Sequence, residues 1–204
     1  MVGKIIVIEG IDGAGKATQV KLLKQELEKA GRKVSTYSYP DYTSVYGERI
    51  KSFLYKKIDI NVDELFLLYQ IDMVKDRSRI LKDIEEERYV VMDRYVFSTI
   101  AYQSAGGFDY ETAEKLVKFI GMPIPDVVFY VDISADISMY RKEKQKGKMD
   151  IDKFESNKSF LSRVSLYYKK LLDENFYSKK WERIDGSLKI EEINDLITKK
   201  LNEL

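Results

Sequence analysis

The sequence predicts an α/β fold: a three-layer, doubly wound sandwich in which a five-stranded parallel sheet lies between two layers of helices. Two observations support this prediction. Short runs of apolar, mostly β-branched residues recur along the chain, and between them apolar residues are spaced three and four apart, as on one face of a helix. This alternation continues to the end of the chain without a linker or an internal repeat. We therefore expect one domain that spans residues 1–204.

The composition narrows the chemistry that the chain can perform. The 204 residues carry a formal net charge of +1, and they include no histidine and no cysteine. Disulfides, Cys/His zinc sites, thiol nucleophiles and histidine acid–base catalysis are therefore excluded. The balanced charge gives no reason to expect a nucleic acid as partner. Apolar runs are too short to cross a membrane, and the N-terminus does not resemble a signal peptide, so we expect a cytoplasmic protein with no membrane partner.

The first strand is expected at residues 5–8, and helical spacing follows at residues 19–30. The segment between them contains Gly10, Ile11, Asp12, Gly13, Ala14, Gly15, Lys16, Ala17 and Thr18. Glycines in such a loop allow backbone N–H groups to point at an anion, and the start of the helix adds partial positive charge. Lys16 is placed to reach the β- and γ-phosphates of a nucleotide. A glycine turn that binds nothing is the alternative, and the agreement of strand, loop and helix disfavours it.

The loop departs from the usual phosphate-loop pattern at one position. Gly10, Gly15 and Lys16 fit G-x-x-x-x-G-K-[ST], but residue 17 is alanine and lacks the hydroxyl that commonly binds Mg²⁺. Thr18 follows one residue later, about 100° further round the helix, where it is better placed to face a phosphate than to bind the ion. We therefore expect nucleotide binding with a weaker hold on Mg²⁺.

The second strand is expected at residues 33–39, and Pro40 ends it. Asp41, Tyr42 and Thr43 then follow at the carboxyl end of the strand, where open α/β sheets bind their ligands. Helical spacing predicts a helix over residues 46–55 and a single long helix over residues 63–87.

The third strand, residues 88–93, ends in Asp93 and is followed directly by Arg94 and a helix over residues 96–105. A carboxylate at that sheet edge can hold Mg²⁺ through its water shell, although it could instead cap the following helix. An arginine at the same edge can clamp a second phosphate with two hydrogen bonds, although an ordinary surface ion pair would look similar in the sequence.

The remaining elements continue the alternation. We expect helices over residues 109–120, from residue 134, over 154–176 and over 190–201, and strands over 126–132 and 181–184. Residues 141–153 are basic and interrupted by glycine. A solvated helix end would have the same composition, but beside a phosphate site we favour a lid that brings positive charge over the transferred group.

Five motifs together resemble the thymidylate kinases, in their order and over nearly the whole chain. They are Glu-Gly-Ile-Asp-Gly-Ala-Gly-Lys at 9–16, Tyr-Pro-Asp-Tyr at 39–42, Asp-Arg-Tyr-Val-Phe-Ser-Thr-Ile-Ala-Tyr-Gln at 93–103, Pro-Ile-Pro-Asp at 123–126 and Ile-Asp-Gly-Ser at 184–187. The resemblance implies the nucleotide kinase fold of the P-loop NTPases. It also implies transfer of the γ-phosphate of ATP to dTMP with Mg²⁺, in a homodimer.

The resemblance also implies roles for individual residues. Lys16 would hold the ATP phosphates, Arg94 the acceptor phosphate and Asp93 the metal. Asp12 would accept a hydrogen bond from the 3′-hydroxyl of the deoxyribose or act through Mg²⁺, and Arg141 would pack on adenine. The residues expected around dTMP are Asp12, Tyr42, Tyr69, Met73, Arg94, Thr99, Tyr102 and Gln103. Among these, Tyr69 would stack on the base, Tyr102 would lie under the sugar, and Thr99 and Gln103 would approach the thymine edge.

Three departures from the family pattern bear on specificity. Gly13 carries no charge, so the resemblance points to the type that places its catalytic cation in the lid, here Lys142, Lys144, Lys146 or Lys148. Met73 stands where an arginine commonly reaches the thymine, which leaves a relaxed base specificity open. Tyr42 stands where many members carry an arginine for the acceptor phosphate, which leaves more of that work to Arg94.

Two other classes of function remain open from the sequence. The first is a kinase for another deoxynucleoside monophosphate or for a deoxynucleoside, in which Asp41 could serve as general base toward an alcohol. The second is a nucleotide-binding switch without catalysis, which Ala17 favours. The guanine motif of a GTPase is absent from the sequence, because its only Asn-Lys pair, Asn157-Lys158, is followed by Ser-Phe.

Overall fold

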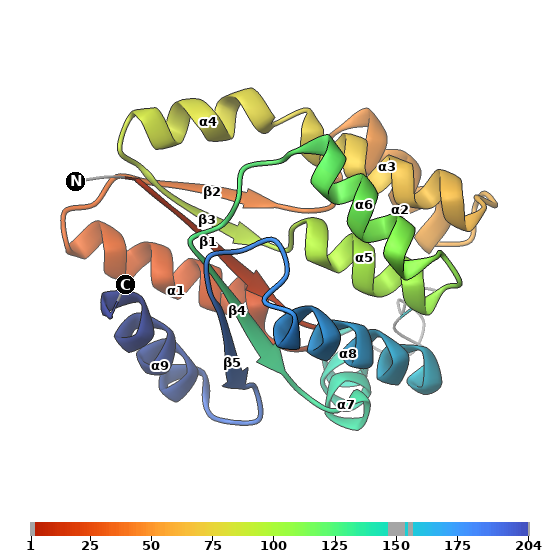
Figure 1. Ribbon diagram of the computed structural model, residues 1–204. Helices are drawn as coiled ribbons and strands as arrows, with labels where there is room; N and C mark the ends of the chain where they lie inside the picture. The colour runs from red at the N-terminus through yellow and green to blue at the C-terminus, as the bar shows by residue number, and fades with distance from the viewer. Residues whose placement is uncertain (1–2, 147–153, 155–156, 204) are drawn as a thin grey trace.

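Five parallel strands form one twisted sheet in the order β2-β3-β1-β4-β5 (Figure 1). The computed structural model describes residues 3–146, 154 and 157–203. The strands are β1 (Lys4–Glu9), β2 (Val34–Ser38), β3 (Tyr89–Asp93), β4 (Val127–Asp132) and β5 (Trp181–Asp185). The predicted five-stranded α/β sandwich is confirmed.

At least one helix lies between each pair of consecutive strands, as parallel pairing requires. They are α1 (Lys16–Lys29), α2 (Val45–Leu54), α3 (Val62–Val74), α4 (Arg77–Glu85), α5 (Val96–Ala105), α6 (Tyr110–Ile120), α7 (Ala135–Lys146), α8 (Lys158–Asp173) and α9 (Ile190–Asn202). Helices α1 and α9 pack together on one face of the sheet, and α5 and α8 pack together on the other (Figure 1). Because both faces are covered, the central strands are apolar and buried along most of their length, and each ends in an acidic residue: Glu9, Asp93 or Asp132.

The long helix predicted over residues 63–87 is wrong, because the chain forms two helices there. Helix α3 ends at Val74, and α4 begins at Arg77. No glycine or proline marks the break. The residues between the helices, Lys75 and Asp76, instead turn toward Tyr39 at the end of β2, where the Tyr39 hydroxyl donates a hydrogen bond to Asp76 (3.2 Å). A tertiary contact has overridden an apolar spacing that suits one continuous helix.

The helix predicted over residues 154–176 is shorter than expected. Helix α8 begins at Lys158, where the Asn157 side chain accepts a hydrogen bond from the backbone N–H of Phe160, and it ends at Asp173. An asparagine at this position caps a helix by satisfying one of its free N–H groups. Most of the predicted lid, residues 147–153 including Lys148, lies outside the described residues.

The fold brings the predicted site residues to one edge of the sheet. The glycine loop follows β1, the Tyr-Pro-Asp-Tyr turn follows β2, and Asp93 closes β3. These strands are adjacent and parallel, so their carboxyl ends lie side by side. Among the described residues, no helix is both long and apolar enough to span a membrane.

Candidate functional site

The loop between β1 and α1 owes its shape to glycine. Gly10, Gly13 and Gly15 have φ angles of 147°, 76° and 87°, a region that side chains with a Cβ rarely adopt. The buried Lys16 ammonium donates a hydrogen bond to the carbonyl of Ile11 (3.0 Å), which closes the loop on itself. We call residues 10–15 the donor loop.

Helix α7 packs directly on the donor loop and explains why residue 13 carries no side chain. A Cβ on Gly13 would lie 2.9 Å from the carbonyl oxygen of Ser138. The Ser138 hydroxyl donates to the carbonyl of Asp12 (2.6 Å), and the Arg141 guanidinium donates to the carbonyls of Gly13 (3.2 Å) and Gly186 (3.0 Å). The predicted adenine-packing residue Arg141 therefore also ties α7 to the loop.

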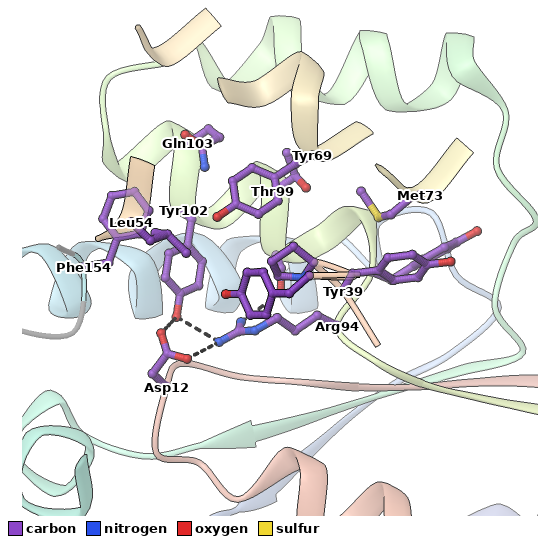
Figure 2. Close-up of a pocket in the computed structure, with 14 residues that line it drawn as sticks. Asp12, Tyr39, Leu54, Tyr69, Met73, Arg94, Thr99, Tyr102, Gln103 and Phe154 are labelled. Atoms are coloured by element: carbon purple, nitrogen blue, oxygen red, sulfur yellow. Dashed lines mark hydrogen bonds and ion pairs between the residues drawn. The ribbon is translucent and has the colours of Figure 1, made fainter. Parts of the chain in front are cut away.

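Arg94 lies across the mouth of the donor loop because its backbone is left-handed, with φ of 67°. Its Nη2 donates to Asp12 Oδ1 (2.6 Å) and to the Tyr102 hydroxyl (3.3 Å), and its Nη1 donates to the Gly10 carbonyl (3.1 Å). The Tyr102 hydroxyl completes the triangle by donating to Asp12 Oδ2 (2.9 Å), as Figure 2 shows. Three residues predicted separately are thus brought together by the fold.

The charges of Asp12, Arg94 and Lys16 strongly affect one another's pKa values. Burial alone would raise the pKa of Asp12, but the positive charges of Arg94, Lys16 and Lys142 lower it well below its usual value. The carboxylate therefore stays ionised across the physiological range. Burial and the nearby Arg94 lower the pKa of Lys16 to about 8, although Asp12 acts in the opposite direction. Lys16 is thus poised to gain its full charge when phosphate anions arrive.

A second group of side chains, whose role was not predicted from the sequence, holds Arg94 through hydrogen bonds and a buried carboxylate. Glu9 is fully buried and accepts hydrogen bonds from the Ser98 hydroxyl (2.6 Å), the Tyr168 hydroxyl (2.8 Å) and the Tyr95 N–H (2.8 Å). The Ser98 and Tyr168 hydroxyls in turn accept from Arg94 Nη1, at 3.1 Å and 3.4 Å. Burial raises the pKa of Glu9, and Arg94 partly offsets that effect.

The only sequence signal for this support was a glutamate at the end of an otherwise apolar strand. Glu9 interrupts the apolar run of β1, and a buried carboxylate is costly unless it is paired. Tyr168 lies in the middle of α8, where its spacing is that of any core residue. Nothing in the local sequence distinguishes it from the neighbouring aromatic side chains.

Two pockets adjoin at this site. The first, about 510 Å³ with its open mouth included, lies between the donor loop and helices α3 and α5. It is lined by all eight residues expected around the acceptor nucleotide: Asp12, Tyr42, Tyr69, Met73, Arg94, Thr99, Tyr102 and Gln103. We call it the acceptor pocket. Tyr69, Thr99 and Gln103 lie at one end of it, and the Asp12–Arg94 pair lies at the other (Figure 2).

The second pocket is larger, about 1930 Å³ with its open mouth included, and runs over the start of α1. We call it the donor pocket. Its lining residues include Asp12, Gly13, Ala14, Gly15, Lys16, Ala17, Thr18, Asp93, Arg141, Lys142 and Lys144. Gly10 and Ile11 do not line it, and their contribution is structural, through carbonyls that accept from Arg94 and Lys16.

Asp12, Arg94 and Tyr42 line both pockets. A group bound in one pocket and a group bound in the other would therefore meet beside the Asp12–Arg94 pair. Such a double pocket, with cations at the junction, suits the transfer of a phosphoryl group from one bound molecule to another.

The comparisons with known proteins agree with this geometry. The family model of thymidylate kinase matches residues 8–197. The chain belongs to the thymidylate kinase family. Among its relatives, the thymidylate kinase of Danio rerio is 31% identical over 94% of this chain and 86% of the relative. The thymidylate kinase of Thermoanaerobacter sp. is 35% identical over 91% of each chain.

An archaeal relative and a solved structure extend the comparison. The probable thymidylate kinase of Methanococcus aeolicus is 33% identical over 97% of this chain and 95% of the relative. The structure of thymidylate kinase from Candida albicans covers 99% of this chain and 92% of that chain, with a TM-score of 0.81 and 23% identity. That likeness supports the fold.

The far end of the acceptor pocket is neutral in this thymidylate kinase family member. Asp12 and Arg94 are the charged residues that line the pocket in the described part of the chain, and both lie at the same end. Met73, 1% exposed, forms part of the apolar wall. Gln103 lines this end of the pocket, and among the described residues its buried amide Nε2 has no hydrogen-bond partner.

The donor pocket offers one carboxylate that suits a magnesium ion. Asp93 ends β3 beside Lys16 and lines the pocket, whereas Ala17 offers no side-chain oxygen at the start of α1. Within the described part of the chain, no cluster of three or more acidic side chains forms a metal site. This donor set fits Mg²⁺ that is bound mainly by nucleotide phosphates and water, with one protein carboxylate.

Proposed function

We propose that this member of the thymidylate kinase family transfers the γ-phosphate of ATP to dTMP, giving dTDP and ADP. The observation that carries the proposal is the shared lining of the two pockets, because Asp12 and Arg94 border both. ATP would occupy the donor pocket, with its phosphates in the donor loop. The acceptor phosphate of dTMP would approach from the acceptor pocket toward Arg94.

The residues at the junction supply positioning and charge. Lys16 would hold the β- and γ-phosphates, and its proton is retained more firmly once those anions surround it. Arg94 would release Asp12 in part to bind the acceptor phosphate with its planar guanidinium. Asp12, which stays ionised, would accept a hydrogen bond from the 3′-hydroxyl of the sugar. The phosphate acceptor is already an anion, so the transfer needs no general base.

Magnesium is part of this proposal. The ion, when bound, neutralises charge on the transferring phosphates, and Asp93 would hold it through its water shell. Thr18 would face the phosphates. Lys142 and Lys144 line the donor pocket and would supply the lid cation, while the side chain of Lys146 and residue Lys148 lie outside the described residues. Arg141 would contact adenine in addition to its hydrogen bonds to the loop.

Base recognition would rest on neutral groups. Tyr69 would stack on the base, Thr99 and Gln103 would meet its polar edge, and Tyr102 would lie below the sugar. An amide can present either its oxygen or its nitrogen, and Met73 adds no charged donor. We therefore propose that discrimination against other pyrimidine bases is weaker than an arginine at position 73 would make it.

A deoxynucleoside kinase is the weaker alternative. It would use Asp41 as general base, but the Asp41 carboxylate lines neither pocket and instead pairs with Lys75 (3.2 Å). Its second oxygen accepts from the Thr43 hydroxyl (2.6 Å), and these contacts lower the pKa of Asp41. A carboxylate with a lowered pKa that points away from the reaction is poorly suited to take a proton.

We also propose a cytoplasmic homodimer without nucleic acid partners. Leu67, Ile71 and Val74 recur at helical spacing on α3 and are partly exposed, so they form an apolar stripe on its outer face. A second copy of the chain could cover this stripe. Sedimentation of the protein and of its Ile71→Glu variant tests this assignment: a dimer that becomes monomeric supports it, and a native monomer contradicts it.

The decisive experiment is ADP release with ATP and Mg²⁺ against dTMP, dUMP, dCMP, dGMP and thymidine. Turnover of dTMP, with measurable turnover of dUMP or dCMP, is expected. Turnover of thymidine without turnover of dTMP would overturn the assignment of Arg94 to an acceptor phosphate. Turnover of dTMP alone would keep the kinase and reject the weakened base discrimination.

A further inference from the structure

We propose that Lys75 is a positioning residue for the acceptor nucleotide, because it fixes the loop that forms one wall of the acceptor pocket. That loop, residues 39–44, follows β2 and is called the acceptor loop here. The proposal rests on the proposed function, since it assigns a role in binding dTMP. Lys75 itself lines neither pocket, so its effect would pass through the loop.

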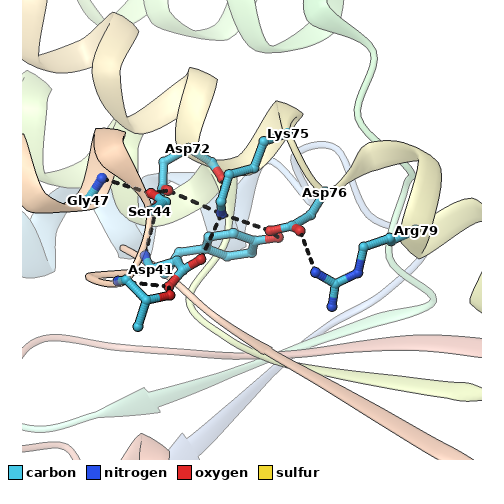
Figure 3. A network of polar contacts seen from close by, with 9 residues as sticks. Asp41, Ser44, Gly47, Asp72, Lys75, Asp76 and Arg79 are labelled. Atoms are coloured by element: carbon cyan, nitrogen blue, oxygen red, sulfur yellow. Dashed lines mark hydrogen bonds and ion pairs between the residues drawn. The ribbon is translucent and has the colours of Figure 1, made fainter.

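Lys75 lies at the centre of a cluster of carboxylates (Figure 3). Its Nζ is 2.8 Å from Asp76 Oδ2, 3.1 Å from Asp72 Oδ1 and 3.2 Å from Asp41 Oδ2. It also donates to the backbone carbonyl of Asp72 (2.7 Å). The side chain is 21% exposed, and that of Asp72 is 1% exposed. The lysine therefore connects the break between α3 and α4 with the acceptor loop.

Asp72 connects Lys75 to the backbone of the acceptor loop. Its Oδ2 accepts from the backbone N–H of Asp41 (2.7 Å), and its Oδ1 accepts from the Ser44 hydroxyl (2.6 Å). Ser44 is also the cap of α2, because its hydroxyl accepts from the N–H of Gly47 (2.9 Å). A buried carboxylate is stable as an anion only when it is paired, and Lys75 is the cation beside it.

The close packing of α2 leaves the loop little freedom. A Cβ on Gly47 would lie 2.0 Å from the carbonyl oxygen of Asp41. Lys75 also lies 5.3 Å from the centroid of the Tyr39 ring, whose hydroxyl donates to Asp76. Tyr39, Pro40 and Tyr42 of this loop line both pockets. A shift of the loop would therefore move the wall against which the acceptor binds.

The charge of Lys75 has a second effect, on the electrostatic potential at the acceptor pocket. Without Lys75, the negative charge of Asp41, Asp72 and Asp76 behind the acceptor pocket would lose the cation that the three carboxylates share, while the exposed Arg79 pairs with Asp76 (3.1 Å). A nucleoside monophosphate is a dianion and would be repelled by that field. The loss of Lys75 should therefore weaken acceptor binding more than donor binding.

The test compares Lys75→Met, which keeps the aliphatic stem, with Lys75→Arg, which keeps the charge. Lys82→Met is the matched control, since Lys82 lies on the exposed side of α4 and contacts only Glu86 at 3.9 Å among the ion pairs of the described residues. We expect Lys75→Met to raise the KM for dTMP about tenfold with the KM for ATP changed less than about twofold. Lys75→Arg should recover most of the loss, and Lys82→Met should behave as the unmodified protein.

Hydrogen exchange of the loop amides gives a readout that needs no substrate. In Lys75→Met, the amides of Asp41 and Ser44 should exchange faster, while those of the donor loop should not change. Asp41→Asn removes one ion pair of the cluster. Because it adds no negative charge, it isolates the effect on the loop: the KM for dTMP should rise by about two- to threefold if the ion pair holds the loop, and this variant replaces Lys75→Met if Lys75→Met does not fold.

The proposal is overturned if Lys75→Met leaves the KM for dTMP unchanged, or if the KM for ATP rises by the same factor. It is also overturned if exchange of the loop amides stays at the rate of the unmodified protein. If the unmodified protein does not phosphorylate dTMP, the proposed function fails, whereas the exchange measurement still decides whether Lys75 holds the loop.

Discussion

The donor loop and the acceptor loop meet at the same site but are held in different ways. The donor loop is shaped by its backbone: three glycines with positive φ angles and carbonyls bound by Lys16, Arg94 and Arg141. The acceptor loop is held by side-chain charges that come from another helix, with Lys75 and Asp72 at their centre. The donor loop therefore depends first on its glycines, whereas the acceptor loop depends on the ion pairs of Lys75.

The largest effect is expected where the donor loop meets its ligand. Lys16→Ala should lower kcat for dTMP phosphorylation by about 10³-fold, because it removes the preorganised charge on the transferring phosphate. Single-turnover assays measure this loss. Lys21→Ala, on an exposed position of the same helix, is the control and should keep full activity. Turnover of Lys16→Ala within about tenfold of the unmodified protein would contradict the role of the donor loop.

A matched pair of glycine substitutions separates the two loops. Gly13→Ala places a Cβ near Ser138 and in a left-handed conformation, and Gly47→Ala places one against the Asp41 carbonyl. Each change should destabilise the protein by about 1–3 kcal/mol. Gly13→Ala should raise mainly the KM for ATP, and Gly47→Ala mainly the KM for dTMP. Thermal unfolding and steady-state kinetics measure the two effects, and equal shifts in both KM values would show that the loops are not independent.

The smallest expected effect is a dependence of ATP binding on pH. The pKa of Lys16 in the ligand-free protein is lowered to about 8. Lys16 is therefore cationic below that pH and loses its charge above it. The KM for ATP should change little below about pH 7 and should rise about fourfold between pH 7 and pH 8.5. Steady-state kinetics with varied ATP across this range measure the change.

The acceptor side supplies the control for that titration. The phosphate of dTMP is already a dianion above about pH 7, and the guanidinium of Arg94 keeps its proton throughout. The KM for dTMP should therefore stay flat over the range in which the KM for ATP rises. A parallel rise of both constants would assign the pH effect to a group other than Lys16.

The sequence predicted the conformation of the donor loop better than that of the acceptor loop, and the reason is physical. Glycines, a lysine at fixed spacing and an apolar strand are local features, and they predicted the conformation of residues 10–18. The fold class follows from apolar periodicity in the same way. The contact of Arg94 with Asp12 joins residues 82 positions apart, and Tyr102, eight positions after Arg94, completes it. The order of the elements predicted that these residues share one sheet edge, but it did not predict their hydrogen bonds.

The features that sequence reasoning missed are those that depend on distant partners. Lys75 and Asp76 looked like polar positions of one long helix, and only the packing of Tyr39 against them reveals the break. Tyr168 looked like an ordinary core residue, and Ser98 belonged to the 93–103 motif but was given no role of its own. The contacts of their hydroxyls with the buried Glu9 and Arg94 are visible only in the structure. No local pattern encodes such a network, because each side chain alone is unremarkable.

Helix α3 is apolar on more than one side, and this has a consequence for how the molecule could respond to its neighbours. Tyr69 and Met73 face the acceptor pocket, while Leu67, Ile71 and Val74 form the stripe on the opposite side. The two surfaces are separated by one helix diameter, about 10 Å. If a second copy of the chain covers the outer stripe, as proposed, a single helix would separate that interface from the space left for the base.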